Sequence, residues 1–493
     1  LSANWTNYNT NLVTNIFAKD RFNYDVLYHT DLSRSSGETL GIDLAKINWG
    51  NYDLVVIDES HNFRNRDTYK DKETRYDKLM NKIIRQGVKT KVLMLSATPV
   101  NNRFNDLKNQ LALAYEGNAS LLEQKLDTER DISTIFSRAQ ASFNTWAKLD
   151  PKQRNTQAIL NLLDFDFFKL LDSVTIARSR KHIQTFYDTK DIGQFPQRLK
   201  PISFRCALST EHNTVSLNEI YADLSLIKMS VYAPVSYIFP SALKKYEELF
   251  DTQVGDGKKF KQKDREKSLQ ALMTVNLLKR LESSVHAFRL TLTVLKNNIE
   301  KVLSQIADFE ARQSLDEISI STDFGYDEDE NNEGLSSEDL IGKKLKIHLG
   351  DLDLMTWKVD LEGDHQLILG LLRSIKVIDA PHDAKLQHLK QQVIEKVQQP
   401  INPSNYKVII FTAFADTAHY IYEHLAPYLH EQHQLHSACI TGSKNNSTIK
   451  TMLGSRKAYD MQGLLTLFSP KSKQKQDIFP NEAREIDILI ATD

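Results

Sequence analysis

The sequence predicts an α/β protein in which two parallel-sheet regions are separated by a large, mainly helical region. Four short apolar segments rich in β-branched residues each end abruptly in polar residues, as central strands of parallel sheets do. Two of these segments lie near the start of the chain and two near its end. Between them, residues 103–175 and 266–312 carry apolar residues at helical spacing. We therefore expect each of the four strands to be buried on both faces of a sheet.

The first strand, residues 54–57, ends in Asp58 and Glu59, and His61 follows two positions later. Adjacent carboxylates at the carboxyl edge of a buried strand can hold Mg²⁺ and orient a water molecule, as nucleotide hydrolysis requires. An acidic pair can also simply open a helix, where it interacts favourably with the helix dipole.

The other three strands run into residues that carry hydroxyl groups. Residues 92–95 run into Ser96 and, two positions on, Thr98. Near the end of the chain, strands end at Thr412 and Thr492, and a further strand-like segment runs into Thr441 and Gly442. Ligands of open parallel sheets bind outside the carboxyl ends of the strands. The Ser96–Pro99 run could equally cap a helix with Pro in its first turn.

Composition limits the classes of protein to which the chain can belong. A length of 493 residues predicts two or three domains. The formal net charge of -1 means that nucleic acid would have to be bound by a local patch. Cys206 and Cys439 form no metal-ligand spacing and no disulfide framework, which favours a cytoplasmic location. No apolar run reaches the length of a membrane span, and no secretory signal is present.

The strand ends carry a resemblance to a known family. Residues 58–61, Asp-Glu-Ser-His, resemble motif II, the Walker B or DEAD/DEAH-type box, of superfamily 2 helicases. Residues 62–65, Asn-Phe-Arg-Asn, resemble the continuation of motif II in the Swi/Snf-like branch of DNA translocases. Residues 95–102 resemble motif III of the same superfamily. Residues 277–284, Leu-Leu-Lys-Arg-Leu-Glu-Ser-Ser, resemble a segment in the helical insertion of bacterial members. In that segment Lys279 and Arg280 are candidates for a nucleic-acid backbone contact or an interlobe salt bridge.

The resemblance implies two RecA-like parallel-sheet lobes, both incomplete, with a large helical insertion between them. Residues 1–205 would form lobe 1 with a helical protrusion, 206–378 the insertion, and 379–493 a lobe 2 that stops inside motif V. The acidic, aliphatic-poor residues 313–345 are expected to form a mobile loop within the insertion. The first residue is Leu1, not Met, so we expect an internal piece of a larger protein.

The resemblance also implies ATP and Mg²⁺ as cofactors. Asp58 would hold Mg²⁺, Glu59 would orient and deprotonate the attacking water, and His61 would couple the site to Ser96 and Thr98. The chain contains no G-x-x-x-x-G-K-[ST] phosphate loop and no motif VI arginines. The expected activity, a DNA-dependent ATPase and helicase, therefore belongs to the full-length protein, and this chain alone is expected to be inactive.

Family motifs further imply contacts to the backbone of duplex DNA, which position the protein without reading sequence. The residues that match these motifs or a neighbouring Arg-rich segment are Asn4, Trp5, Arg178, Arg180, Thr412, Thr441, Gly442 and Thr492. Plainer explanations exist for several: Trp5 as a core residue, Thr441–Gly442 as an ordinary turn, and the Arg178 region as a solvated charge run.

Two alternative functions remain open at this stage. One is a DNA- or partner-binding scaffold without turnover, and the other is an RNA helicase, whose motif III also contains Ser-Ala-Thr. Motors of this family serve repair, transcription recycling and phage defence, often with a nuclease fused elsewhere. A fused or associated nuclease or restriction/defence module is therefore a further expected partner.

Overall fold

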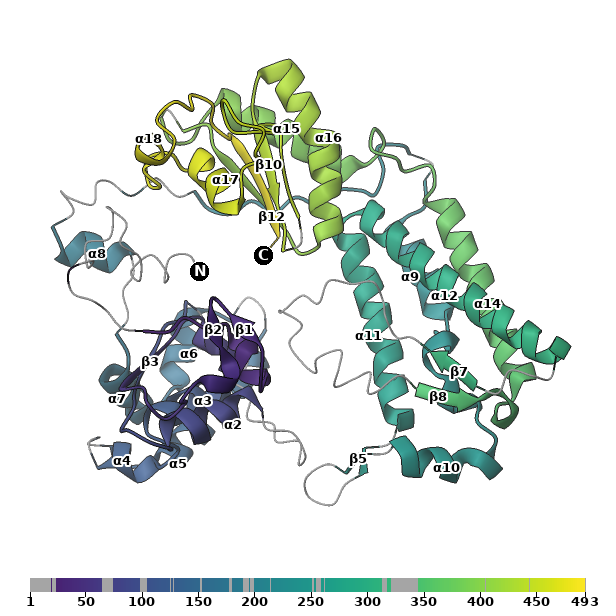
Figure 1. The fold of residues 1–493 in the computed structure, drawn as a ribbon, viewed down its shortest axis with the longest axis horizontal. Coiled ribbons are helices and arrows are strands. Elements are labelled where there is room, and N and C mark those ends of the chain that lie inside the picture. The colour runs from purple at the N-terminus through teal and green to yellow at the C-terminus, as the bar shows by residue number, and fades with distance from the viewer. Residues whose placement is uncertain are drawn as a thin grey trace. The chain divides into compact units, whose positions relative to one another are not determined.

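The computed structural model divides into two compact units, Leu1–Gly193 with Gln253–Lys258, and Gln194–Thr252 with Lys259–Asp493 (Figure 1). The structure describes residues 19, 24–63, 74–97, 104–124, 126, 128–150, 153–176, 180–188, 195, 199–212, 214–250, 252–253, 259–260, 262–312, 317–320, 345–403, 405–442 and 444–492.

The first unit contains a parallel strand pair packed against helices. Strand β3 (Leu54–Ile57) pairs with β4 (Lys91–Met94) in parallel, with Ile57 opposite Met94. A short antiparallel pair, β1 (Glu38–Thr39) and β2 (Ile42–Asp43), precedes it. The helices are α2 (Arg75–Lys78), which continues as the π-helical η5 (Leu79–Ile84), α3 (Phe104–Ala114), α4 (Ala119–Glu123), α5 (Ile132–Ala147), α6 (Thr156–Leu162), α7 (Phe165–Val174) and α8 (Arg180–Phe186). The helical character predicted for residues 103–175 is confirmed in the described part of that range.

The prediction that the strands are buried on both faces is wrong for this pair. Leu54 is 53% exposed, and Val56 and Leu93 on the same face are also exposed. The opposite face, with Ile57, packs into a core that includes residues of η5, α3, α5 and α7. Side chains of successive strand residues point to opposite faces, so helices that pack on one face leave the other uncovered. The apolar run predicted the strand correctly but not the coverage of its second face.

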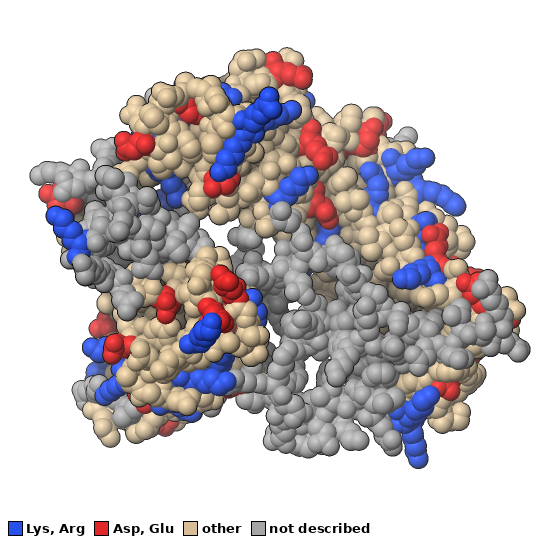
Figure 2. Space-filling view, in the orientation of Figure 1, with Lys and Arg blue, Asp and Glu red and all other residues tan. Residues whose placement is uncertain are grey.

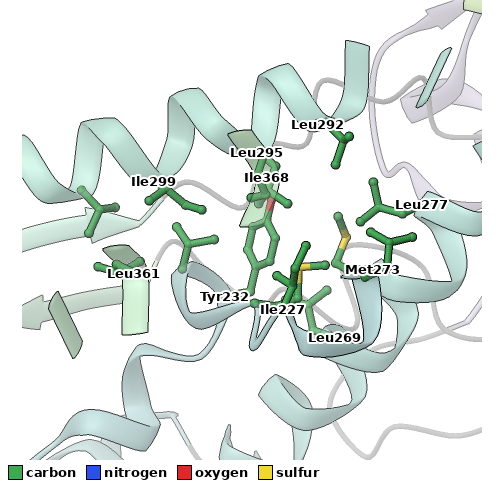
Figure 3. Close-up of a cluster of buried hydrophobic side chains, with 14 of the residues drawn as sticks. Ile227, Tyr232, Leu269, Met273, Leu277, Leu292, Leu295, Ile299, Leu361 and Ile368 are labelled. Carbon is green, nitrogen blue, oxygen red and sulfur yellow. The ribbon is translucent and has the colours of Figure 1, made fainter. Parts of the chain in front are cut away.

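The helical part of the second unit is built on three long helices, α11 (Gln262–Ser283), α12 (Val285–Arg312) and α14 (Leu354–Ser374). Figure 3 shows their apolar side chains converging: Met273 and Leu277 from α11, Leu292 from α12, and Ile368 from α14. The amphipathic helical region predicted at 266–312 is thus confirmed, as two helices. Shorter helices complete this part: α9 (Leu217–Leu226) and α10 (Pro240–Phe250), with the 3-10 helices η6 (Ser230–Tyr232) and η7 (Pro234–Tyr237) between them.

Part of the stretch expected to be a loop forms a strand. Within residues 313–345, β7 (Glu317–Ile320) pairs antiparallel with β8 (Leu345–His348), and Ile318 lies opposite the fully buried Ile347. Alternating apolar residues in Glu-Ile-Ser-Ile favour such a strand. The acidic residues between the two strands lie outside the described residues. A second short pair, β5 (Thr252–Gln253) with β6 (Lys259–Phe260), also belongs to this region of the sequence.

The last part of the chain forms a four-stranded sheet in the order β11-β10-β12-β9. Strands β9 (Val408–Thr412), β12 (Ile488–Thr492) and β10 (Ser437–Ile440) are parallel, and β11 (Asn445–Ser447) is antiparallel to β10. The helices of this part are α15 (Ala384–Gln398), α16 (Ala415–His433), α17 (Met461–Phe468) and α18 (Lys475–Ile478). Asp383 and Asp460 start α15 and α17 by accepting hydrogen bonds from backbone N–H groups.

The central strand β12 is buried on both faces, as predicted. Ile488 and Ile490 pack with residues of α15 and α16, whereas Leu489 packs with residues of α17. The edge strand β9 differs, because Phe411 is 67% exposed and Ile409 is also exposed. The α/β class, with parallel strands near both ends of the chain and a helical region between them, is confirmed. In the described residues no helix is long and apolar enough to cross a membrane.

Candidate functional site

The turn after β3 is held directly against the end of β4. Beyond the last paired strand residues, Leu95 N–H donates to Ile57 O at 2.8 Å, and Ser60 N–H donates to Leu95 O at 2.9 Å. These two bonds extend the parallel ladder past both strands. They bring the Asp-Glu-Ser-His turn beside Ser96, although the two segments are more than thirty residues apart in the sequence.

Four of the five predicted catalytic residues lie at this edge. His61 Nδ1 lies 3.3 Å from Ser96 Oγ and 3.3 Å from Glu59 Oε2. The Glu59 N–H donates to Asp58 Oδ1 at 3.0 Å, which places the two carboxylates on one turn. The imidazole therefore links the carboxylate of the first strand end to the hydroxyl of the second. Thr98, the fifth predicted member, lies outside the described residues.

Glu59 itself has an unusual backbone conformation, with φ of 49°. A residue with a Cβ is disfavoured in this left-handed region, and such residues are found preferentially where function requires them. The η4 segment (Ser60–Phe63), a 3-10 turn, follows at once. Contacts on the residues around Glu59 must therefore hold the turn in place.

One such contact was not predicted from the sequence. Ser60 Oγ donates to Gln110 Oε1 at 3.1 Å, and both residues are only 2% exposed. Gln110 belongs to α3, on whose buried side Leu107 and Leu111 also lie. A lone amide among the apolar positions of a helix needs a buried partner. The sequence signal for Gln110 was therefore its place three residues after Leu107.

The carboxylates of this edge suit a magnesium ion that is shared with a phosphate. Mg²⁺ prefers oxygen ligands, keeps several waters, and commonly takes only one or two protein carboxylates together with substrate phosphates. Asp58 and Glu59, both half-buried at the strand edge, provide such oxygens. Among the described residues, no three His, Cys, Asp or Glu side chains gather as a self-sufficient metal cage. Asp58 and Glu59 would be the residues that hold such an ion.

The second sheet brings three more predicted residues to one edge. Thr492 of β12 is paired with Thr412 of β9, at the carboxyl ends of both strands. Thr441 follows β10, whose last residue, Ile440, is paired with Ala491. The sequence predicted that each of these threonines follows or ends a strand, and the structure shows that the three strands are adjacent and parallel.

The hydroxyl of Thr441 has a local structural role. It donates to Lys444 O at 2.8 Å and accepts from Lys444 N–H at 3.2 Å, which closes the turn between β10 and β11. Gly442 is exposed, and a Cβ added there would meet nothing within 4 Å. The plain turn explanation therefore accounts for both residues within the chain, and their contact with phosphate stays a prediction.

Thr412 lies against the helical part of the same unit. Thr412 Oγ1 is 3.3 Å from Ser283 Oγ, and Ser283 and Ser284 both share hydrogen bonds with Thr417 Oγ1, at 2.8 and 3.0 Å. Nearby, Arg280 donates to Asp416 Oδ2 at 2.6 Å and covers the Phe414 ring at 4.6 Å. Arg280 thus forms a salt bridge with the first turn of α16, within the same unit. The interlobe bridge and the nucleic-acid contact considered for Arg280 stay predictions.

The remaining predicted residues are not brought into either edge by the described structure. Asn4, Trp5 and Arg178 lie outside the described residues. Arg180 is exposed at the start of α8. On the face in Figure 2, both Lys and Arg side chains and Asp and Glu side chains are scattered over the described surface.

Comparisons with known proteins add little to this picture. No protein-family model matches the chain, and no curated protein matches it. Among solved structures, the crystal structure of the Pyrococcus furiosus Hef helicase domain aligns with 91% of this chain at 13% sequence identity and a TM-score of 0.22. The chain spans 63% of that domain. A TM-score of this size does not establish a common fold.

Proposed function

We propose that this chain belongs to an ATP-dependent nucleic-acid motor of the superfamily 2 helicase type, with duplex DNA as its track. The observation that supports this most is the contact of His61 with both Glu59 and Ser96 at the joined ends of β3 and β4. A carboxylate, an imidazole and a hydroxyl from two adjacent strand ends form a unit that can sense a nucleotide phosphate and relay its state. The Asp-Glu pair supplies the metal and water functions.

In this proposal Mg²⁺, when bound with ATP, would neutralise charge on the phosphates, and Asp58 would hold it. Glu59 would accept a proton from the attacking water, and His61 would keep the Glu59 carboxylate oriented through its Nδ1 contact. Through its contact with His61, Ser96 would couple a change in the position of the imidazole to the segment that follows β4. In the second sheet, Thr412 and Thr492 would contact the phosphates of the strand along which the motor moves. Such contacts position the protein without reading sequence.

The proposal is tested with Glu59→Gln in the full-length protein. A general base contributes about 10²–10⁴-fold to a rate, so we expect kcat for ATP hydrolysis to fall by at least 100-fold while ATP binding persists. Glu129→Gln is the matched control, since Glu129 is an exposed carboxylate of the same unit. A Glu59→Gln protein that hydrolyses ATP within about two-fold of wild type would refute the role given to Glu59.

The type of nucleic acid is identified by measuring which one stimulates ATP hydrolysis. Duplex DNA should raise the ATPase rate more than single-stranded RNA of equal length. Stronger stimulation by RNA would instead identify an RNA helicase. DNA binding by a full-length protein that does not hydrolyse ATP would identify the scaffold.

A further inference from the structure

The turn that carries the proposed catalytic residues depends on outside support. Glu59 has φ of 49°, a region in which the Cβ of an L-residue is crowded by its own backbone. A peptide of this sequence alone would favour other conformations. The native turn must therefore be stabilised by contacts of its neighbours, and Ser60, between Glu59 and His61, makes them.

Ser60 is fixed from two directions. Its backbone N–H donates to Leu95 O of the segment after β4 at 2.9 Å. Its hydroxyl donates to Gln110 Oε1 at 3.1 Å. Gln110 Nε2 in turn donates to Asp106 O at 3.3 Å, one turn earlier in α3. Because the NH₂ group faces that carbonyl, the amide oxygen is the atom presented to Ser60.

We propose that Gln110 is a positioning residue for the Glu59–His61 turn, an assignment that rests on the proposed function. The hydrogen bond to Ser60 sets the direction in which the side chains on either side of it leave the backbone. It also couples the turn to α3, the helix that follows Ser96 in the chain. The two strand ends and α3 thus hold the carboxylate and the imidazole together.

A positioning role has a different kinetic signature from a purely structural one. A displacement of about 1 Å at a reacting group can cost up to about 10²-fold in rate. Loss of the Gln110 contact should therefore lower kcat while leaving the binding of ATP intact. A bond that only stabilises the fold would instead lower the amount of folded protein and leave kcat per folded molecule unchanged.

The test uses Gln110→Leu, Ser60→Ala and the double variant in the full-length protein. We expect each single variant to lower kcat about ten-fold, with KM for ATP changed by less than two-fold. The double variant should lose no more than either single variant, since all three remove the same bond.

Gln140→Leu is the matched control. Gln140 lies on α5, and its Oε1 accepts from the N–H of Phe104, the first residue of α3, at 2.8 Å, so this substitution removes a side-chain amide contact to α3 without touching the turn. It is expected to keep kcat within two-fold of wild type.

A second measurement does not depend on activity. Hydrogen exchange of the Ser60 amide, followed in peptides covering residues 57–63, should be several-fold faster in Gln110→Leu than in wild type and unchanged in Gln140→Leu. Unchanged exchange at Ser60, or a normal kcat in Gln110→Leu beside an active wild type, would overturn this inference alone. A full-length wild type that hydrolyses no ATP under any nucleic acid would overturn the proposed function instead.

Discussion

The salt bridge between Arg280 and Asp416 provides a quantitative test of how α11 is joined to α16. Arg280 lies near the end of α11, and Asp416 lies in the first turn of α16. The two side chains differ strongly in exposure: that of Arg280 is 7% exposed and that of Asp416 is 42% exposed. If Asp416 is removed, the Arg280 guanidinium stays largely shielded from water, whereas if Arg280 is removed, the Asp416 carboxylate can be hydrated.

This difference predicts unequal costs. Asp416→Ala leaves a buried guanidinium without this carboxylate, and breaking a fully buried pair in this way costs about 3–5 kcal/mol. Because Asp416 is partly solvated, we reduce the expected loss to about 2 kcal/mol. Arg280→Met keeps the apolar stem, and the Asp416 carboxylate regains water. Its expected cost is about 1 kcal/mol, mostly the lost contact with the Phe414 ring.

The assay is urea unfolding, followed by tryptophan fluorescence and by circular dichroism, on both single variants and the double variant. The double variant should cost less than the sum of the singles, since both remove one interaction. Glu310→Ala is the control, because the Lys358–Glu310 pair has a similar separation of 2.9 Å but both partners are substantially exposed. Its expected effect is below about 0.5 kcal/mol. Additive effects, or a larger loss for Arg280→Met than for Asp416→Ala, would refute this reasoning.

Two further predictions concern titrating groups. Burial raises the pKa of the Cys439 thiol to about 11, whereas Cys206 is exposed. Iodoacetamide at pH 8 should therefore label only Cys206 in the native protein, as mass spectrometry would show; rapid labelling of Cys439 would contradict its burial. Hydrogen bonds from Arg484 lower the pKa of Glu482 to about 2. Because this pKa is lower in the folded protein than its ordinary value of 4.5, the ionised Glu482 stabilises the fold at pH values above 4.5. That contribution is lost as the pH falls from 4.5 toward 2. Glu482→Gln should lower the free energy of unfolding at pH 7 by about 1–2 kcal/mol, because solvent screens part of this interaction. It should also flatten the acid dependence of the urea midpoint between pH 5 and 2; an unchanged acid profile would argue against the pairing.

The elements of the fold were largely predictable because they depend on local patterns. Apolar runs that end at Asp58, Ser96 and Thr412 identified three strands and the edge at which polar groups gather. Helical spacing identified the region of α11 and α12 as one amphipathic stretch. The structure divides it at Ser284, whose hydroxyl accepts from Ala287 N–H. A period of 3.6 or 2 residues records which sides of an element are apolar, and that information is contained in the sequence.

Contacts between segments that are distant in the sequence were harder to predict from the sequence. The sequence favoured a link between His61 and Ser96, since both motifs were recognised, and the structure places them 3.3 Å apart. It did not indicate that Ser60 bonds to Gln110, fifty positions away. It also did not indicate that Ser283 lies between Thr412 and Thr417. A polar residue shows that a partner is needed but does not name it.

The sequence by itself determined the apolar strands β3, β4, β9, β10 and β12 to within a residue or two, which polar residues follow them, and that parallel sheets near both ends of the chain flank a helical region. Only the tertiary structure decided which faces of those strands are covered, that Glu59 adopts a left-handed turn, and which side chains hold it. The reason is physical: secondary structure follows from neighbours along the chain, whereas burial and hydrogen-bond partners depend on how separate elements pack.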